Sequence, residues 1–132
     1  MAGETDLDKL IALMQPTLLE GEYVFCTLEE SSLADAVELA PLASFQEKEG
    51  LSLLLEKARA EAAGLQFNSV FRGITLSVHS SLDAVGFTAA VAGKLAAHGI
   101  PSNVVAAHYH DHVFVPLHRA DSALKLLTEL EN

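Results

Sequence analysis

The sequence predicts an α+β fold in which antiparallel strands form sheets that are covered by helices on one face. Its 132 residues are 50% hydrophobic, which is enough for the core of one ordinary domain or two very small ones. Apolar, β-rich runs alternate with segments of helical spacing, and the second half follows the order β-α-β-β-α. A pattern also recurs between residues 51–62 and 113–124: an apolar strand, a basic residue and a helix start. These observations predict two copies of one supersecondary unit.

Helix ends and a turn are recognisable in the first half of the chain. Thr5 and Asp6 are candidate N-caps for a helix that ends before Pro16, and Gly64 is placed as the C′ residue of a later helix. A Glu-Lys-Glu-Gly sequence between two apolar runs is typical of a turn that joins two strands. In chain order we expect a helix over 5–15, a strand over 22–28, a short helix over 31–39, strand, turn and strand over 42–56, and a helix over 57–65.

The clearest helix of the second half is predicted over residues 80–99. Ser80, with Asp83 three residues later, resembles a capping box, and Gly99 followed by Pro101 supplies the stop signal. Apolar side chains surround most of the segment and leave a narrow polar face. The neighbouring segments are expected to be strands over 70–78, 102–109 and 112–117, followed by a closing amphipathic helix over 119–130.

Three histidines stand at every second position of the sequence AAHYHDHVFVP, at His108, His110 and His112. On one extended strand they would share a face and could supply the three protein ligands of a zinc site. Asp111 lies between two apolar runs, however, and aspartate favours turns. The pattern therefore predicts a hairpin with His108 on one strand, His110 in the turn and His112 on the next strand. His108 and His112 could still face each other across it, so metal binding remains an alternative, although we assign no metal ligand.

The charge balance argues against nucleic-acid and membrane partners. Eight Lys and Arg against eighteen Asp and Glu give a formal net charge of -10, so the chain lacks the cationic surface that nucleic acids and anionic membranes attract. The longest uncharged apolar run, AVGFTAAVAG, is too short to cross a bilayer. The first ten residues are acidic and polar, without the pattern of a secretory signal. We therefore expect a cytoplasmic protein.

The sequence carries no catalytic signature. It has no Ser or Cys nucleophile motif, no Gly-rich phosphate loop and no H-E-x-x-H pattern. Its single cysteine, Cys26, can make no internal disulfide and is expected to be a buried small hydrophobe. We expect no catalytic residue, no cofactor and no enzymatic activity.

Residues 71–116 carry a family resemblance. The order β-α-β-β-α-β is the ferredoxin-like arrangement. The segments LDAVGFTAAVAGKLAAHGI and HDHVFVP resemble the strand-to-helix glycine turn and the third strand of ACT domains. The chain is similar to small stand-alone bacterial proteins with two ACT-like units, and more distantly to the tandem units of the eukaryotic arginine sensor. The resemblance implies an N-terminal unit with a leading helix over 1–69 and a C-terminal unit over 70–132.

The same resemblance implies a non-catalytic regulatory module that binds an amino acid or a similar small ligand at an interface between units. A zwitterion needs N–H donors for its carboxylate, which a helix N-terminus after Ser81 would offer, and acceptors for its ammonium group, which Asp83 and Asp111 could provide. Gly86 is unexpected in a helix unless something approaches the backbone there. The predicted ligand-binding residues are Ser81, Asp83, Val85, Gly86, Phe87, His110 and Asp111.

The second unit lacks a fourth strand after its closing helix. We expect that strand to come from residues 22–28 or from a partner chain, and the open sheet edge predicts a homo-oligomer. Two other functions remain as alternatives. One is a metal-binding protein that uses the hairpin of His108, His110 and His112, and the other is a structural assembly partner without a ligand.

Overall fold

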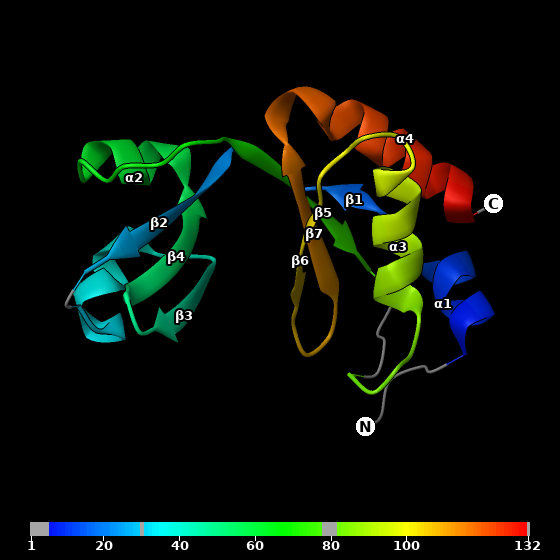
Figure 1. Cartoon of the computed structure of the whole chain (residues 1–132), viewed down its shortest axis with the longest axis horizontal. Helices are drawn as coiled ribbons and strands as arrows, with labels where there is room; N and C mark the ends of the chain where they lie inside the picture. Colours follow the sequence, from blue (N-terminus) through cyan, green and yellow to red (C-terminus); the bar gives the residue numbers. More distant parts are fainter. Residues whose placement is uncertain (1–5, 30, 78–81, 132) are drawn as a thin grey trace. The chain divides into compact units, whose positions relative to one another are not determined.

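The computed structural model describes residues 6–29, 31–77 and 82–131. The chain folds into two compact units, which Figure 1 shows. One unit comprises Gly21–Phe71, and we call it the inserted unit. The chain up to Glu20 and the chain from Arg72 onward together form the other, which we call the discontinuous unit.

The inserted unit is an antiparallel sheet with two short helices on one face. Strand β4 lies between β3 and β2, and Tyr23 of β2 also pairs with Phe71. Side chains of β2 and β4 form a core with Ala36 and Ala60, which come from the two helices, so both helices cover the same face. The elements are β2 (Tyr23–Leu28), the 3-10 helix η1 (Leu33–Leu39), β3 (Ala43–Glu47), β4 (Gly50–Glu56) and α2 (Lys57–Ala62).

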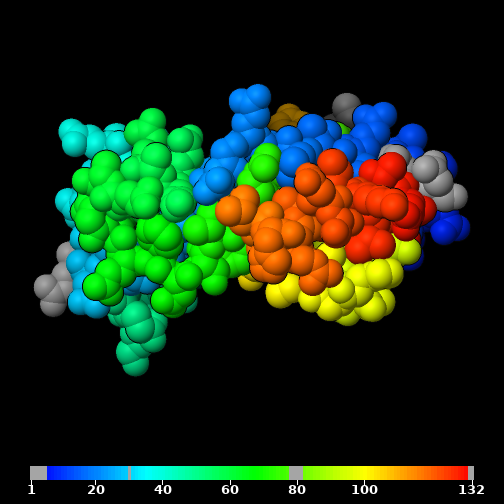
Figure 2. Space-filling model, turned by 90° about the horizontal axis from the view of Figure 1, so that it is seen from above, coloured from blue at the N-terminus to red at the C-terminus, as the bar shows by residue number. Residues whose placement is uncertain are grey.

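The discontinuous unit is a four-stranded antiparallel sheet, in the order β1-β5-β7-β6, with its helices on one face. The core joins alternate residues of β5 and β7 to apolar stripes of the helices. Figure 2 shows α4, in orange and red, between the N-terminal segment in blue and the end of α3 in yellow. The elements are α1 (Leu7–Leu13), β1 (Thr17–Leu18), β5 (Phe71–Leu76), α3 (Phe87–Ala96), β6 (Asn103–Ala106), β7 (Asp111–Pro116), the 3-10 helix η2 (Leu117–Arg119) and α4 (Ala120–Glu131).

The predicted ferredoxin-like α+β class is confirmed, and so is the repeat of a strand followed by a helix. The repeat corresponds to β4 with α2 in one unit and to β7 with α4 in the other. The strand, turn and strand expected over 42–56 are β3 and β4. The short helix expected over 31–39 is a 3-10 helix.

The N-terminal segment packs with the C-terminal part of the chain. Leu10 and Met14 are fully buried in the core of the discontinuous unit, so the leading helix belongs with the C-terminal part of the chain. Strand β1, Thr17–Leu18, pairs with Ile74 and Thr75 along β5, while residues 22–28, from which the completing strand was expected, contact β5 through the pair Tyr23 and Phe71. Burial of the apolar face of α1 brings β1 to this edge.

Helix α3 begins later than predicted. Its first residue is Phe87 and its N-cap is Gly86, whereas a capping box at Ser80 and Asp83 would have started it several residues earlier. Ser80 lies outside the described residues, and Leu82 and Asp83 form an exposed turn. Phe87, Val91 and Leu95 are buried at helical spacing, so the core determines where the helix starts.

The histidine-rich sequence forms a hairpin, as expected, but its loop is longer. Strand β6 ends at Ala106 and β7 begins at Asp111, so both His108 and His110 lie in the loop. His112 is on β7 and pairs with Val105. The prediction that His108 lies on a strand is therefore wrong, and so is its pairing with His112 across the hairpin.

Candidate functional site

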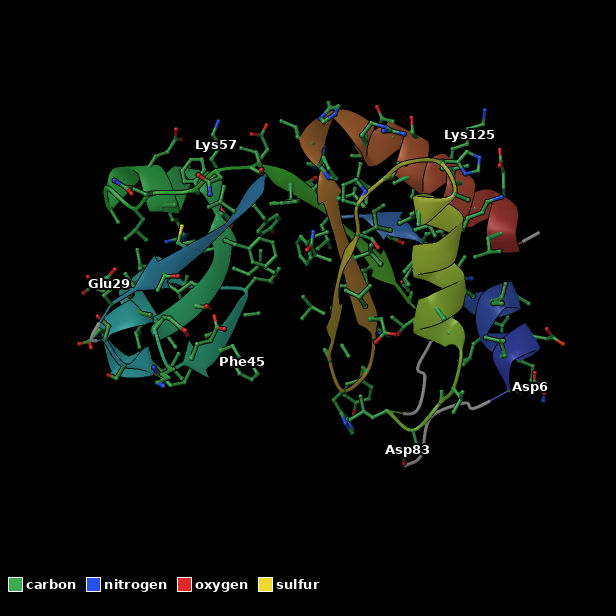
Figure 3. All side chains as sticks on the ribbon, viewed as in Figure 1. Asp6, Glu29, Phe45, Lys57, Asp83 and Lys125 are labelled. Atoms are coloured by element: carbon green, nitrogen blue, oxygen red, sulfur yellow. The ribbon has the colours of Figure 1, made fainter. Side chains whose placement is uncertain are left out.

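The predicted ligand site falls on two loops of the discontinuous unit. The loop before α3 carries Asp83 and Val85, and the loop between β6 and β7 carries His110. Both loops lie toward the lower end of this unit in Figure 1, and Figure 3 labels Asp83 there. Val85 is 84% exposed and Asp83 is exposed as well. Ser81 lies outside the described residues.

Asp111 is the most unusual residue of the site. Within residues 6–29, 31–77 and 82–131 it is the only buried polar or charged side chain, with 7% exposure. Alternate residues of a strand point to the same face, so Asp111 shares a face with Val113 and Val115. These two valines belong to the core that α3 and α4 cover. The carboxylate therefore lies on the helix-covered face, at the end of β7 next to the hairpin loop.

Burial dominates the electrostatics around Asp111. It raises the pKa of the Asp111 carboxyl, while the nearby imidazoles of His112 and His110 lower that pKa. Burial also lowers the pKa of His112, His110 lowers it further, and Asp111 opposes both effects. A carboxylate that has lost much of its hydration is stabilised by a positive group or a hydrogen-bond donor beside it. The site is thus suited to a cation.

Gly86 turns the chain into α3. Its φ of 93° lies in the left-handed region, which residues with a side chain rarely adopt. A Cβ at this position would stand 3.3 Å from Cδ2 of Leu7, so the conformation and the packing of α1 both favour glycine. The Gly86 carbonyl accepts the first helical hydrogen bond, from Ala90 at 2.9 Å. The glycine thus has a structural explanation that does not need a ligand.

Two complementary groups lie toward one end of the discontinuous unit. The first N–H groups of an α-helix have no acceptor within the helix and carry partial positive charge, so they favour a carboxylate. In α3 these groups belong to the turn that begins at Phe87. The Asp111 carboxylate supplies the opposite charge at the hairpin.

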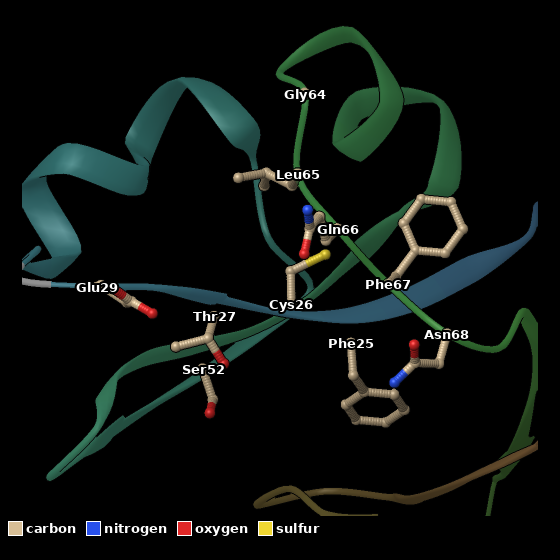
Figure 4. A pocket seen from close by; sticks show the side chains of 10 residues that line it. All are labelled: Phe25, Cys26, Thr27, Glu29, Ser52, Gly64, Leu65, Gln66, Phe67 and Asn68. Atoms are coloured by element: carbon tan, nitrogen blue, oxygen red, sulfur yellow. The ribbon is translucent and has the colours of Figure 1, made fainter.

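The structure also shows a groove that was not predicted from the sequence. It has a volume of about 610 Å³ and lies entirely within the inserted unit (Figure 4). Residues of strands β2 and β4 line one side, and the segment Gly64–Asn68 lines the other. Cys26 is 5% exposed at this groove, as expected for a buried small hydrophobe, and burial raises the pKa of its thiol. The other polar lining side chains are Thr27, Glu29, Ser52, Gln66 and Asn68.

Two features of the described residues bear on other functions. Among residues 6–29, 31–77 and 82–131, no group of three or more His, Cys, Asp and Glu is placed to hold a metal ion. In the same part of the chain, no helix is long and apolar enough to cross a membrane.

Comparisons with known proteins identify the family of the chain. Residues 2–72 match one ACT domain model and residues 68–129 match a second one. The chain therefore belongs to the ACT domain family, with two ACT units in tandem. No curated protein matches the chain.

Solved structures with the same fold include a close relative. A Vibrio cholerae protein of unknown function, described as a possible transport protein, is 49% identical, with 96% of each chain covered and a TM-score of 0.87. A protein from Agrobacterium tumefaciens is 19% identical, with 88% of this chain and 87% of that chain covered and a TM-score of 0.73. The regulatory subunit of aspartate kinase from Thermus flavus is 10% identical, with 92% and 99% coverage and a TM-score of 0.67. The last two likenesses show a shared fold.

Proposed function

We propose that this chain is a non-catalytic regulatory module that binds a free amino acid or a similar small zwitterion. The observation that carries the proposal is the burial of Asp111, a charged side chain on the helix-covered face of the sheet. Burying a carboxylate costs free energy unless a positive or hydrogen-bonding group compensates it. A ligand ammonium group would provide that compensation. Membership of the ACT family supports the regulatory class.

Each predicted residue has a part in this proposal. The first turn of α3, which starts at Phe87 after the Gly86 turn, would bind the ligand carboxylate through backbone N–H groups. Asp111 would accept hydrogen bonds from the ammonium group, and His110 would lie beside it on the hairpin. Asp83 and Val85 would contact the ligand side chain from the loop before α3. Ser81, which lies outside the described residues, stays a predicted ligand-binding residue. These residues remain a proposed set.

The fold neighbours favour action on a partner protein. Structures with the same fold include a regulatory subunit of aspartate kinase and a structure of aspartokinase alpha and beta subunits. By analogy we propose that ligand binding to this chain changes how it associates with other polypeptides, further copies of itself included.

A thermal-shift screen with the twenty common amino acids tests the proposed function. A ligand that binds only the folded chain, present at about 100 times its dissociation constant, adds about 2.7 kcal/mol to the free energy of unfolding. We expect one amino acid or a small related group to raise the melting temperature and the others to leave it unchanged. A uniform absence of shifts at millimolar concentrations would contradict the proposal.

A further inference from the structure

The groove beside Cys26 lies apart from the proposed ligand site. Its volume of about 610 Å³ falls within the range of about 300–1,000 Å³ that is typical of small-molecule sites. All of its lining residues belong to the inserted unit, whereas Asp111 and the first turn of α3 belong to the discontinuous unit. The proposed function therefore gives this groove no role.

The segment after α2 forms one wall of the groove. Leu65 and Phe67 pack against the core of the inserted unit, while Gln66 and Asn68, which alternate with them, are exposed. Asn68 lines the groove together with Phe25, and the same two residues line a smaller adjoining hollow of about 180 Å³ (Figure 4). The alternation thus anchors the segment through apolar side chains and presents two carboxamide groups to the groove.

Strand β2 forms the opposite wall and adds hydrogen-bonding groups. The Lys57 N–H donates to the Glu22 carbonyl at 2.9 Å, which marks a hydrogen-bonded pair at the end of the β2–β4 ladder. Such pairs alternate, so Thr27 turns its N–H and C=O away from β4, toward the side on which β5 pairs with β2. Its side chain and that of Ser52, its partner in register, lie on the sheet face opposite to the helices.

The charge of the groove favours an uncharged ligand. Glu29 is the only charged residue among the ten lining residues, all of which the structure describes. A phosphate or carboxylate group would meet no cationic side chain there and would be repelled by Glu29 and by the formal net charge of -10. Glu29 is itself exposed, so water screens its attraction for a cation.

Phe25 gives the groove an aromatic surface. Its side chain is 41% exposed, and the ring of Phe71 lies 5.3 Å away between centroids, at an interplanar angle of 86°. This edge-to-face contact orients the Phe25 ring, on which a flat ligand ring can stack. The neighbouring Asn68 carboxamide presents one acceptor and a donor side by side. The same pair of groups recognises adenine, whose amine donates and whose ring nitrogen accepts.

We propose that this groove binds an uncharged aminopurine, as the free base or the nucleoside, with its ring on Phe25 and its amine and ring nitrogen at the Asn68 carboxamide. This inference goes beyond the proposed function and does not depend on it. Gln66 and the hydroxyl groups of Thr27 and Ser52 supply further hydrogen bonds to the base or the ribose. The phosphate of a nucleotide finds no cationic partner among the lining residues.

Calorimetric titration of the full chain with adenosine tests this site. We expect saturable binding to the parent chain. Asn68→Leu keeps the approximate size of an exposed side chain and removes its donor and acceptor. It should weaken binding at least about 5-fold, the lower end of the scale for a bidentate pair with a base. Gln46→Leu is the matched control, because it removes an exposed carboxamide of the same unit that does not line the groove, and it should bind like the parent.

A phosphorylated ligand tests the charge argument. Adenosine monophosphate should bind the parent chain at least about 5-fold more weakly than adenosine, and Glu29→Gln should reduce that difference. Side-chain amide signals in an NMR spectrum locate the site. Those of Gln66 and Asn68 should shift when adenosine is added, while that of Gln46 stays in place. Circular dichroism confirms folding, and Gln66→Leu replaces Asn68→Leu if that variant does not fold.

Three results would overturn the inference. The first is an absence of adenosine binding at millimolar concentration. The second is an unchanged affinity for adenosine in the folded Asn68→Leu or Gln66→Leu variant, because the carboxamide wall would then not contact the ligand. The third is adenosine monophosphate that binds the parent chain as tightly as adenosine does, because the groove would then not select against anions.

Discussion

Thr75 and His112 join the two central strands of the discontinuous unit: Oγ1 of Thr75 lies 3.0 Å from Nδ1 of His112, within hydrogen-bonding distance. Thr75 is on β5 and His112 on β7. Burial is the main cause that lowers the pKa of His112, so the folded chain favours a neutral imidazole at this position.

The lowered pKa of His112 predicts that the stability of the chain depends on pH. The folded pKa of His112 lies below its unfolded value of about 6.5, so the unfolded chain binds more protons between those two values. The stability contribution of His112 is therefore present above about pH 6.5 and is lost as the pH falls toward the folded pKa. Urea unfolding between neutral and mildly acidic pH should show a smaller loss in His112→Asn than in the parent chain.

The difference between parent and variant includes a change at Asp111, because His112→Asn removes one of the imidazoles that lower the Asp111 pKa. That change also makes the stability loss at acidic pH smaller in the variant. The raised pKa of Asp111 acts in the opposite sense, because the folded chain then binds the extra proton. His118→Asn, at an exposed position of η2, serves as the control. Equal pH slopes for the parent chain and His112→Asn would contradict the assignment.

A pair of glycine substitutions tests the packing of the discontinuous unit. A Cβ at Gly73 would lie 2.8 Å from Cε2 of Phe114 and 3.0 Å from Cδ1 of Leu19. Gly73→Ala should therefore lower the free energy of unfolding by about 1–3 kcal/mol through overpacking. Gly93 lies in α3 with nothing within 4 Å of the added Cβ, so Gly93→Ala should raise stability by about 0.5–1 kcal/mol. Denaturant midpoints measure both, and a stable Gly73→Ala protein would refute the close approach.

The Gly86 turn predicts a backbone effect. Gly86→Ala should destabilise the chain by about 1–2 kcal/mol, because its φ of 93° is unfavourable for a residue with Cβ. Gly86→Asn should cost less, since asparagine tolerates the left-handed region better. If alanine and asparagine give equal unfolding midpoints, backbone strain is not the reason for glycine. The strain also makes Gly86 a poor position for a binding test.

Cys26 offers a probe of the inserted unit. Its side chain is 5% exposed and burial raises its pKa, so little reactive thiolate reaches solvent. A disulfide reagent such as Ellman's reagent should react at least about 100-fold more slowly with the native chain than with the urea-unfolded chain. A variant that combines Cys26→Ser with Thr27→Cys moves the thiol to the exposed neighbouring position and should react fast. Fast labelling of native Cys26 would contradict its burial.

Local signals were enough to predict the strands and helices with strong caps or turns. The Glu-Lys-Glu-Gly turn marked β3 and β4, and Gly64 ended α2 in the left-handed conformation. The start of α3 could not be predicted, because Ser80 and Asp83 mimic a capping box while burial of Phe87 decides the boundary. Strand β1 has two residues, too few to show alternation, and depends on non-local pairing with β5.

The candidate site, like the fold, could be predicted from the sequence only in part. Its residue types come from the ACT resemblance, and the turn at His110 and Asp111 could be predicted from turn chemistry, whereas the loop before α3 was predicted to be helical. The burial of Asp111 could not be predicted, because it depends on the β6–β7 register, which places the residue on the helix-covered face. The groove beside Cys26 was missed because it depends on where the chain runs after α2.

Calorimetric titration of the best amino acid from the screen, against the parent chain and Asp111→Asn, tests the central claim most directly. The amide keeps the shape of the side chain and removes its charge, and Asp121→Asn on the exposed side of α4 controls for net charge. The loss of a charged hydrogen bond costs about 1.5–3 kcal/mol, so Asp111→Asn should bind about 10- to 150-fold more weakly, while Asp121→Asn binds like the parent. Equal affinities of the folded Asp111→Asn variant and the parent chain would contradict the account, because the buried carboxylate would then not be the ammonium site.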